Sequence, residues 1–210
     1  MLPIRWLPFV LAWMIALTGC LASATPVSLQ DGFEEDLEAW TILSSPAPDE
    51  QGRGDLWNLS LSEAAAASGN RSLTFEINAT ERAVTVWLYR PISGLDPLER
   101  YRAKVSVQGL GPGELAPGRL DAILYLGAER PKDLHDLHPR DPDGSPGEND
   151  EGWNFGTRDR LDKVEGWTRF SLHQELDAPA NGRLFVGVGL FVDDGVAGTF
   201  HLDELVVDLR

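Results

Sequence analysis

Apolar and polar residues alternate along much of the chain after residue 30, which is the pattern of β-strands with one buried face. The clearest examples are segments 72–77, 101–107 and 168–172, each bounded by Gly, Pro, Asn or Asp. Further segments of this kind are 83–89, 120–126, 184–192 and 199–207. Together they predict about eight to ten strands.

Helical signals are sparse in the same region. The run of Glu and Ala at 63–67 contains helix-forming residues, but Ser68-Gly69-Asn70 stops it after a turn or two. Many strands, regular turn signals and little helix predict an all-β fold, an antiparallel β-sandwich or barrel. We expect one such domain over residues 31–210.

One stretch interrupts the alternation. Residues 127–160 are rich in Asp, Glu, Pro, Gly and His and contain no clear strand pattern. A loop of this length in a compact domain is usually functional or disordered. We therefore predict a long acidic loop at about 127–160.

The first residues have the composition of an export signal. Arg5 is followed by an apolar stretch at 6–17, which is shorter than the roughly 20 residues that span a bilayer. The segment Leu17-Thr18-Gly19-Cys20 resembles the bacterial lipobox, in which the cysteine receives a diacylglycerol and becomes the mature N-terminus. Cys20 is the single cysteine of the chain, which favours this role and excludes an internal disulfide.

The lipobox resemblance implies a signal peptide at 1–19, a tether at 20–30, and attachment to a membrane of the bacterial cell envelope. Leu21 follows the cysteine where a retention signal would have Asp, so we expect an outer-membrane location in a Gram-negative cell. The alternative is cleavage after Ala22-Ser23-Ala24, which would release a soluble protein beginning at Thr25.

The charge of the chain narrows the class of partner. The formal net charge is −15 at pH 7, so polyanions would be repelled and nucleic-acid binding is not expected.

Several landmarks, in this order along the chain, resemble the jelly-roll carbohydrate-binding modules of families 4 and 9, in the galactose-binding-domain-like superfamily. They are Asp31-Gly32-Phe33-Glu34 with Trp40, the segment 67–73, the strand that starts at Tyr101, Gly166-Trp167, and the segment 199–205. The resemblance implies a jelly-roll sandwich whose first and last strands lie side by side. It also implies a structural Ca²⁺ near the ends of those strands, with carboxylates from Glu34 and Asp203 and an oxygen from the loop at Asn70.

Sugar binding needs aromatic faces with polar groups nearby. In the segment 84–89, alternation places Trp87 and Tyr89 on the face opposite the aliphatic residues, where they could form a stacking platform. Tyr125 lies on another predicted strand, and Phe185, Gly187, Gly189 and Phe191 share one face of a third, with the glycines leaving an open floor. Candidate polar partners one strand away are Arg102, Lys104 and Gln108. The same aromatic residues could instead be packing residues.

The sequence has no Gly-x-Ser-x-Gly elbow, no His-Glu-x-x-His, no phosphate loop and no dinucleotide fingerprint. We therefore expect a non-catalytic lipoprotein that binds a glycan or another extracellular ligand. The alternatives are a structural or protein-interaction envelope lipoprotein that uses the acidic loop, and a polysaccharide-active enzyme.

Overall fold

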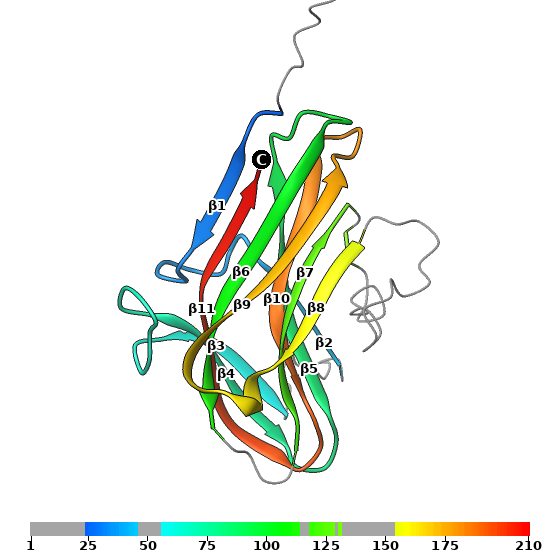
Figure 1. Ribbon diagram of the computed structural model, residues 1–210. Helices are drawn as coiled ribbons and strands as arrows, with labels where there is room; N and C mark the ends of the chain where they lie inside the picture. The colour runs from blue at the N-terminus through cyan, green and yellow to red at the C-terminus, as the bar shows by residue number, and fades with distance from the viewer. Residues whose placement is uncertain (1–23, 46–55, 114–117, 129, 132–153) are drawn as a thin grey trace, which may run out of the picture.

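The computed structural model describes residues 24–45, 56–113, 118–128, 130–131 and 154–210. In these residues, two antiparallel β-sheets pack face to face as a β-sandwich (Figure 1), so the fold is all-β, as the sequence predicts. The helical structure described there is a single 3-10 turn, η2 (Leu161–Lys163). None of the described segments is a helix with the length and apolar character needed to cross a bilayer.

The first sheet has six strands, in the order β3-β4-β11-β6-β9, and β1 pairs with β11 outside that path. The strand bounds are β1 (Val27–Asp31), β3 (Trp57–Ser62), β4 (Ser72–Ala79), β6 (Arg100–Pro112), β9 (Glu165–Asp177) and β11 (Val196–Leu209).

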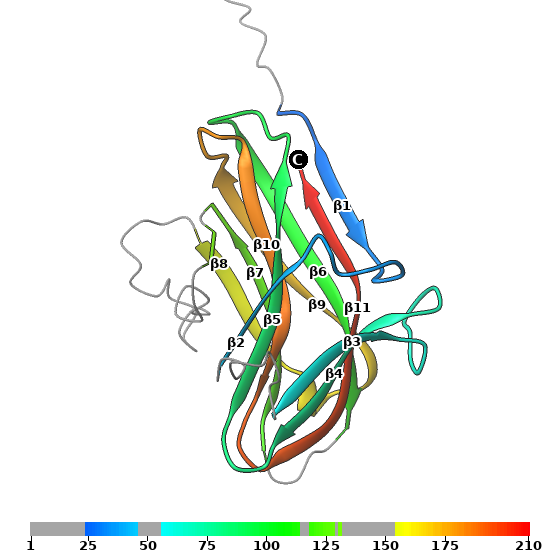
Figure 2. The ribbon, with the colours of Figure 1, turned by 180° about the vertical axis from the view of Figure 1, so that it is seen from behind.

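The second sheet has five strands, in the order β2-β5-β10-β7-β8 (Figure 2). The strand bounds are β2 (Thr41–Ser45), β5 (Val84–Ser93), β7 (Leu120–Gly127), β8 (Asn154–Arg160) and β10 (Arg183–Val192).

The first and last strands lie side by side, as the resemblance implies. β1 is antiparallel to β11, with Val27 opposite Leu209 and Asp31 opposite Leu205. β1 therefore includes residues 27–30, which we had assigned to the tether. Val27 and Leu29 pack against the core, which explains why this short segment is part of the sheet.

The predicted acidic loop is shorter than expected at its C-terminal end. β7 ends at Gly127, but Asn154–Arg160 form β8, which pairs with β7. Residues 132–153, most of the predicted loop, lie outside the described residues, as do the predicted signal peptide and Cys20.

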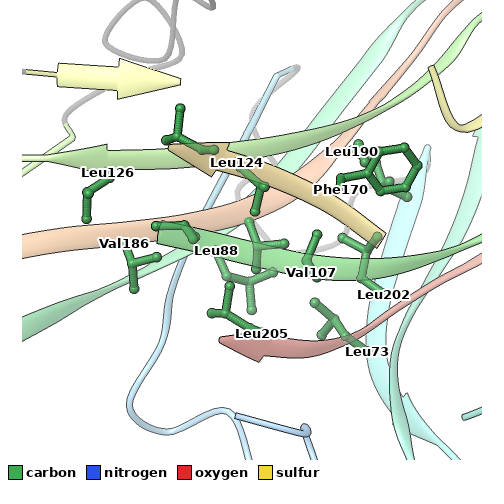
Figure 3. Close-up of a cluster of buried hydrophobic side chains, with 14 of the residues drawn as sticks. Leu73, Leu88, Val107, Leu124, Leu126, Phe170, Val186, Leu190, Leu202 and Leu205 are labelled. Atoms are coloured by element: carbon green, nitrogen blue, oxygen red, sulfur yellow. The ribbon is translucent and has the colours of Figure 1, made fainter. Parts of the chain in front are cut away.

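The core lies between the two sheets and is built from the inward-facing residues of both. Leu88, Leu124 and Val186 of the five-stranded sheet approach Val107 and Leu202 of the six-stranded sheet (Figure 3). All five side chains are fully buried. Burying such residues contributes about 1.5–3 kcal/mol each, so the alternating pattern that predicts the strands also drives the packing of the sheets.

Candidate functional site

The predicted aromatic platform lies on the outer face of the five-stranded sheet. Tyr89, Gly187 and Tyr125 are directly opposite one another on β5, β10 and β7. Trp87 and Gly189 form the next row that faces outward. These aromatic side chains form a cluster separate from the main core, because alternation directs them away from the other sheet.

The rings of this cluster contact one another. The ring centroids of Trp87 and Tyr89 are 5.8 Å apart, and those of Trp87 and Tyr125 are 5.7 Å apart. Phe185 adds a fourth ring, 6.2 Å from Tyr89. The tilted and edge-to-face arrangements are those that aromatic pairs prefer. The aromatic side chains that alternation places on one face thus lie together in space.

The glycine floor is occupied by Trp87. A Cβ atom added at Gly187 would overlap the indole ring, and one added at Gly189 would overlap the Cβ of Trp87. The two glycines therefore make room for the indole on β10. The expectation that they leave an open floor is wrong, because Trp87 fills that space.

The platform is not open to solvent. Trp87, Tyr89 and Tyr125 are 0%, 3% and 1% exposed, so they do not present free ring faces. Phe185 and Leu43 are half-buried and pack against the cluster. The indole Nε1 of Trp87 is buried and has no hydrogen-bond partner among the described residues. Trp57 Nε1 and Arg90 Nε are in the same condition, so this feature does not by itself mark a ligand site.

Arg130 covers part of this cluster. Its guanidinium lies 5.9 Å from the centre of the Tyr89 ring, and its Nε donates a 2.8 Å hydrogen bond to the Tyr89 hydroxyl. Arg130 itself is exposed. The rim of the aromatic cluster therefore has one charged side chain that is both hydrogen-bonded to it and open to water.

The polar partners predicted for this face lie on the other sheet. Arg102 and Gln108 belong to β6, whose neighbours are β9 and β11, whereas the neighbours of β5 are β2 and β10. The chain crosses from one sheet to the other between β5 and β6, so strands adjacent in sequence are not adjacent in space. Arg102 pairs with Glu175, and Gln108 donates to Glu204.

The residues predicted to bind calcium meet at the loop between β3 and β4. Glu34 Oε1 accepts hydrogen bonds from the backbone N–H groups of Asn70 (2.9 Å) and Arg71 (3.2 Å). Asp203 Oδ2 accepts from the backbone N–H groups of Ala67 (2.8 Å) and Ser68 (3.1 Å). The resemblance therefore brought together residues that do converge on one loop.

The arrangement of the Glu34 and Asp203 carboxylates does not match the ligand shell of a Ca²⁺ ion. Calcium requires six to eight oxygen ligands, whereas N–H groups point at the carboxylates of Glu34 and Asp203. Arg71 adds a positive charge, and its guanidinium donates to the carbonyl oxygen of Glu34. Burial raises the pKa of Asp203. No cluster of three metal-ligating side chains occurs within the described ranges, and calcium binding stays a prediction of the resemblance.

A second group of charged side chains lies at the start of β7, where β8 leads into η2. Asp121 and Asp162 are fully buried, and their carboxylates pair with Arg119, Arg160 and Lys163. The hydrogen bond from Arg160 lowers the pKa of Asp162 to about 2. Local alternation does not predict this cluster, because Asp121 meets Arg160 only when β8 pairs with β7.

An open hollow lies on the other sheet, where β3, β4 and β11 run together. Its volume is about 410 Å³. The polar residues that line it are Asn58, Glu76, Asn78 and Thr199, all of them exposed. This surface is not among the sites predicted from the sequence. The alternation of Trp57-Asn58-Leu59-Ser60-Leu61-Ser62 is the signal that could have placed Asn58 on an outward face.

Comparison with known proteins supports the fold. No protein-family model matches the chain, and no curated protein matches it. A carbohydrate-binding module from the beta-sandwich superfamily, described as having promiscuous specificity, is 16% identical with a TM-score of 0.51. The match covers 83% of this chain and 59% of that one, so the chain spans less than two thirds of that protein's length.

Two further solved structures are similar. TmCBM61, determined in complex with beta-1,4-galactotriose, is 12% identical with a TM-score of 0.46, over 84% of this chain and 92% of that one. The enzymatically active domain of tailspike protein 4 of bacteriophage CBA120 is 11% identical with a TM-score of 0.45, over 84% of this chain and 20% of that one. The chain thus has the all-β, two-sheet fold of β-sandwich carbohydrate-binding modules, on the likeness to the promiscuous module.

Proposed function

We propose that this chain is a non-catalytic carbohydrate-binding module, and that it binds glycan at the aromatic cluster of the five-stranded sheet. The observation that carries the proposal is the group of contacting rings of Trp87, Tyr89, Tyr125 and Phe185 on the outer face of a sheet. Sugars stack their C–H faces on accessible aromatic rings, and in this cluster such access is at the half-buried Phe185 and at Tyr89 once Arg130 moves away.

The four rings have different roles in this proposal. Trp87 is the buried floor, packed on the two glycines of β10. Phe185 is half-buried and Tyr89 lies under Arg130, so these two rings are at the rim where a ligand arrives.

Arg130 is a removable cover. Displacing it costs a cation–π contact of about 0.5–1 kcal/mol and one hydrogen bond of about 1 kcal/mol. Stacking a sugar on two rings supplies about 1–3 kcal/mol, and the guanidinium can then donate to sugar hydroxyls. The energies are comparable, so binding with displacement of Arg130 is energetically feasible.

We also propose a cellular location for the protein. The lipobox resemblance at Cys20 supports an exported lipoprotein tethered to the cell envelope, outer membrane in a Gram-negative cell. A polysaccharide of the envelope or its surroundings is then the ligand within reach.

A glycan array, followed by affinity electrophoresis in gels that contain the polysaccharides that bind, tests the function. Phe185→Leu keeps apolar bulk but removes the ring face, and we expect it to weaken binding about 2- to 10-fold. Leu98→Ala is the matched control, because Leu98 is an apolar side chain that is 73% exposed and is not part of the cluster. Absence of any glycan binding by the unaltered protein, or equal binding by the two variants, contradicts the proposal.

The floor role of Trp87 gives a separate expectation. Because its indole is fully buried, Trp87→Ala should lower the free energy of unfolding by about 3–5 kcal/mol. Chemical denaturation monitored by circular dichroism measures this loss. A change of less than about 1 kcal/mol would mean that the indole is not packed as described.

A further inference from the structure

The hollow on the six-stranded sheet has side chains that converge on one outward face. Asn58 of β3 and Thr199 of β11 are both direct cross-strand partners of Glu76 on β4. Directly opposed residues point to the same side of a sheet, and Asn78, two residues after Glu76, points there as well. The adjacent residues Phe75 and Ile77 are buried in the core, so this is the outer side.

The polar groups of the hollow are prearranged for ligand hydroxyls. Asn58 Nδ2 donates a 3.0 Å hydrogen bond to Glu76 Oε2. This bond uses one of the two amide hydrogens and one of the two carboxylate oxygens, so the pair still offers a donor and acceptors side by side. A carboxylate next to an amide is suited to two neighbouring hydroxyl groups, because each hydroxyl can donate to one group and accept from the other.

The size of the hollow suits a small saccharide. It spans three neighbouring strands, about 10 Å at the usual strand separation. Gly198 also lines it through its backbone, because a Cβ atom there would point toward Phe200 on the core side. Leu56, Trp57 and Ile77 also border the hollow. Ile77 and its cross-strand partner Trp57 point toward the core, so the polar side chains form the outward face of the hollow.

The charge of the hollow decides among ligand classes. Glu76 is the acidic residue that lines it, and the whole chain has a formal charge of −15, so an anionic glycan would be repelled. A divalent cation is disfavoured because an amide N–H, rather than a second carboxylate, faces Glu76. A neutral polyhydroxylated ligand remains.

We propose that the hollow lined by Asn58, Glu76, Asn78 and Thr199 is a second carbohydrate-binding site, specific for a neutral mono- or disaccharide with adjacent free hydroxyls. It lies on the opposite sheet from the aromatic cluster, and the two sites share no residue. One chain would therefore hold two glycan segments at once, one on each face of the sandwich.

Isothermal titration calorimetry of the full chain with cellobiose, maltose, lactose and mannobiose tests this inference. The first variant is Phe185→Leu/Tyr89→Ala, which disables the aromatic cluster, and we expect it to keep one saccharide site per chain. Adding Glu76→Gln to it should weaken that remaining site about tenfold, because a charge-assisted hydrogen bond becomes a neutral one. The matched control is Glu165→Gln, an exposed glutamate at the far edge of the same sheet.

The outcomes separate the two sites. Loss of all saccharide binding in a folded Phe185→Leu/Tyr89→Ala protein overturns the second site and leaves the proposed function intact. Equal affinity of the Glu76→Gln and Glu165→Gln proteins also overturns it. If Glu76→Gln alone, in the otherwise unaltered chain, removes all binding, the hollow is the binding site and the aromatic cluster is not.

Thermal unfolding of each variant confirms that it is folded. Thr199→Trp, which fills the hollow from an exposed position, is a second variant that should block saccharide binding there.

Discussion

Asp162 shows how strongly one residue can depend on its neighbours in this fold. Its side chain is fully buried, and Arg160 donates to both of its oxygens, at 2.6 Å and 2.5 Å. The backbone N–H of Leu120 donates to Oδ1, and Lys163 lies 3.3 Å from Oδ2. A buried carboxylate is stable only when its charge is compensated in this way. Asp162 thereby joins the end of β8 to the start of β7.

The pKa of Asp162 makes this contribution depend on pH. Because the hydrogen bond from Arg160 lowers the pKa from 3.8 to about 2, the folded state favours the ionised form. The stabilisation is fully present above pH 3.8 and is lost as the pH falls through about 2. We expect Asp162→Asn to lower the free energy of unfolding by about 2 kcal/mol at pH 7, and the difference from the unaltered protein to shrink toward pH 2. Denaturant titrations at several pH values measure it, and a difference that is constant down to pH 2 would contradict the assignment.

At the level of the elements, the loop between β3 and β4 is fixed from two sides. Glu34, which follows β1, and Asp203 of β11 both accept backbone N–H groups of this loop. Gly69 adopts a φ of +64° beside Glu34, where a Cβ atom would overlap the carboxylate. Only glycine satisfies both conditions at this position. The two carboxylates therefore tie the residues after the first strand and the last strand to the loop.

This arrangement predicts how the protein responds to calcium. We expect the protein to melt at the same temperature, within about 1 °C, in about 5 mM CaCl₂ and in about 5 mM EDTA, because N–H groups already engage the carboxylates. A calcium concentration of this order would saturate even a weak site. Glu34→Gln should lower the melting temperature in both solutions alike. Differential scanning fluorimetry provides the measurement, with Glu165→Gln as the control for loss of an exposed charge. A calcium-dependent rise of several degrees that Glu34→Gln abolishes would establish the metal site implied by the resemblance.

The elements that could be predicted from the sequence are those with long alternation. β4, β5, β6, β7, β9, β10 and β11 coincide with predicted strands, because each has one core face. β3 alternates as well and could have been predicted. β8 could not, since Asn154-Phe155-Gly156-Thr157-Arg158-Asp159-Arg160 has one apolar residue and becomes a strand by pairing with β7. Strand neighbours such as β6 with β9 and β11 depend on crossing between sheets, which local alternation does not encode.

For the candidate sites too, the sequence predicts which face a side chain lies on but not which other segments cover it. Alternation put Trp87, Tyr89 and Tyr125 on one outer face, and this part of the prediction is consistent with the cluster found there. Their burial could not be predicted, because it depends on Leu43, Phe185 and Arg130 from other segments. Faces are local properties of a strand, whereas exposure is a property of what packs on it.

In the whole molecule, the two ends of the domain lie apart from the two outer sheet faces. β1 begins at Val27, opposite Leu209 near the end of β11, so the start of the domain and the C-terminus lie at one end of the sandwich (Figure 1). Both proposed glycan sites lie on the sheet faces rather than at this end. A tether at the start of β1 would leave both faces open to the surroundings.

The position of Cys20 makes that geometry testable. Residues 20–26 reach at most about 25 Å when fully extended, so a lipid on Cys20 would hold this end of the sandwich close to the bilayer. When the chain is expressed in a bacterium, we expect it to incorporate labelled palmitate and to fractionate with membranes, and we expect Cys20→Ser to abolish both. Ser23→Ala is the control, because it keeps the small residues of the alternative cleavage site while leaving the cysteine. A mature protein that begins at Thr25, found by N-terminal sequencing of the unaltered chain, would instead mean cleavage after Ala24 and release, and the glycan sites would then act away from the cell surface.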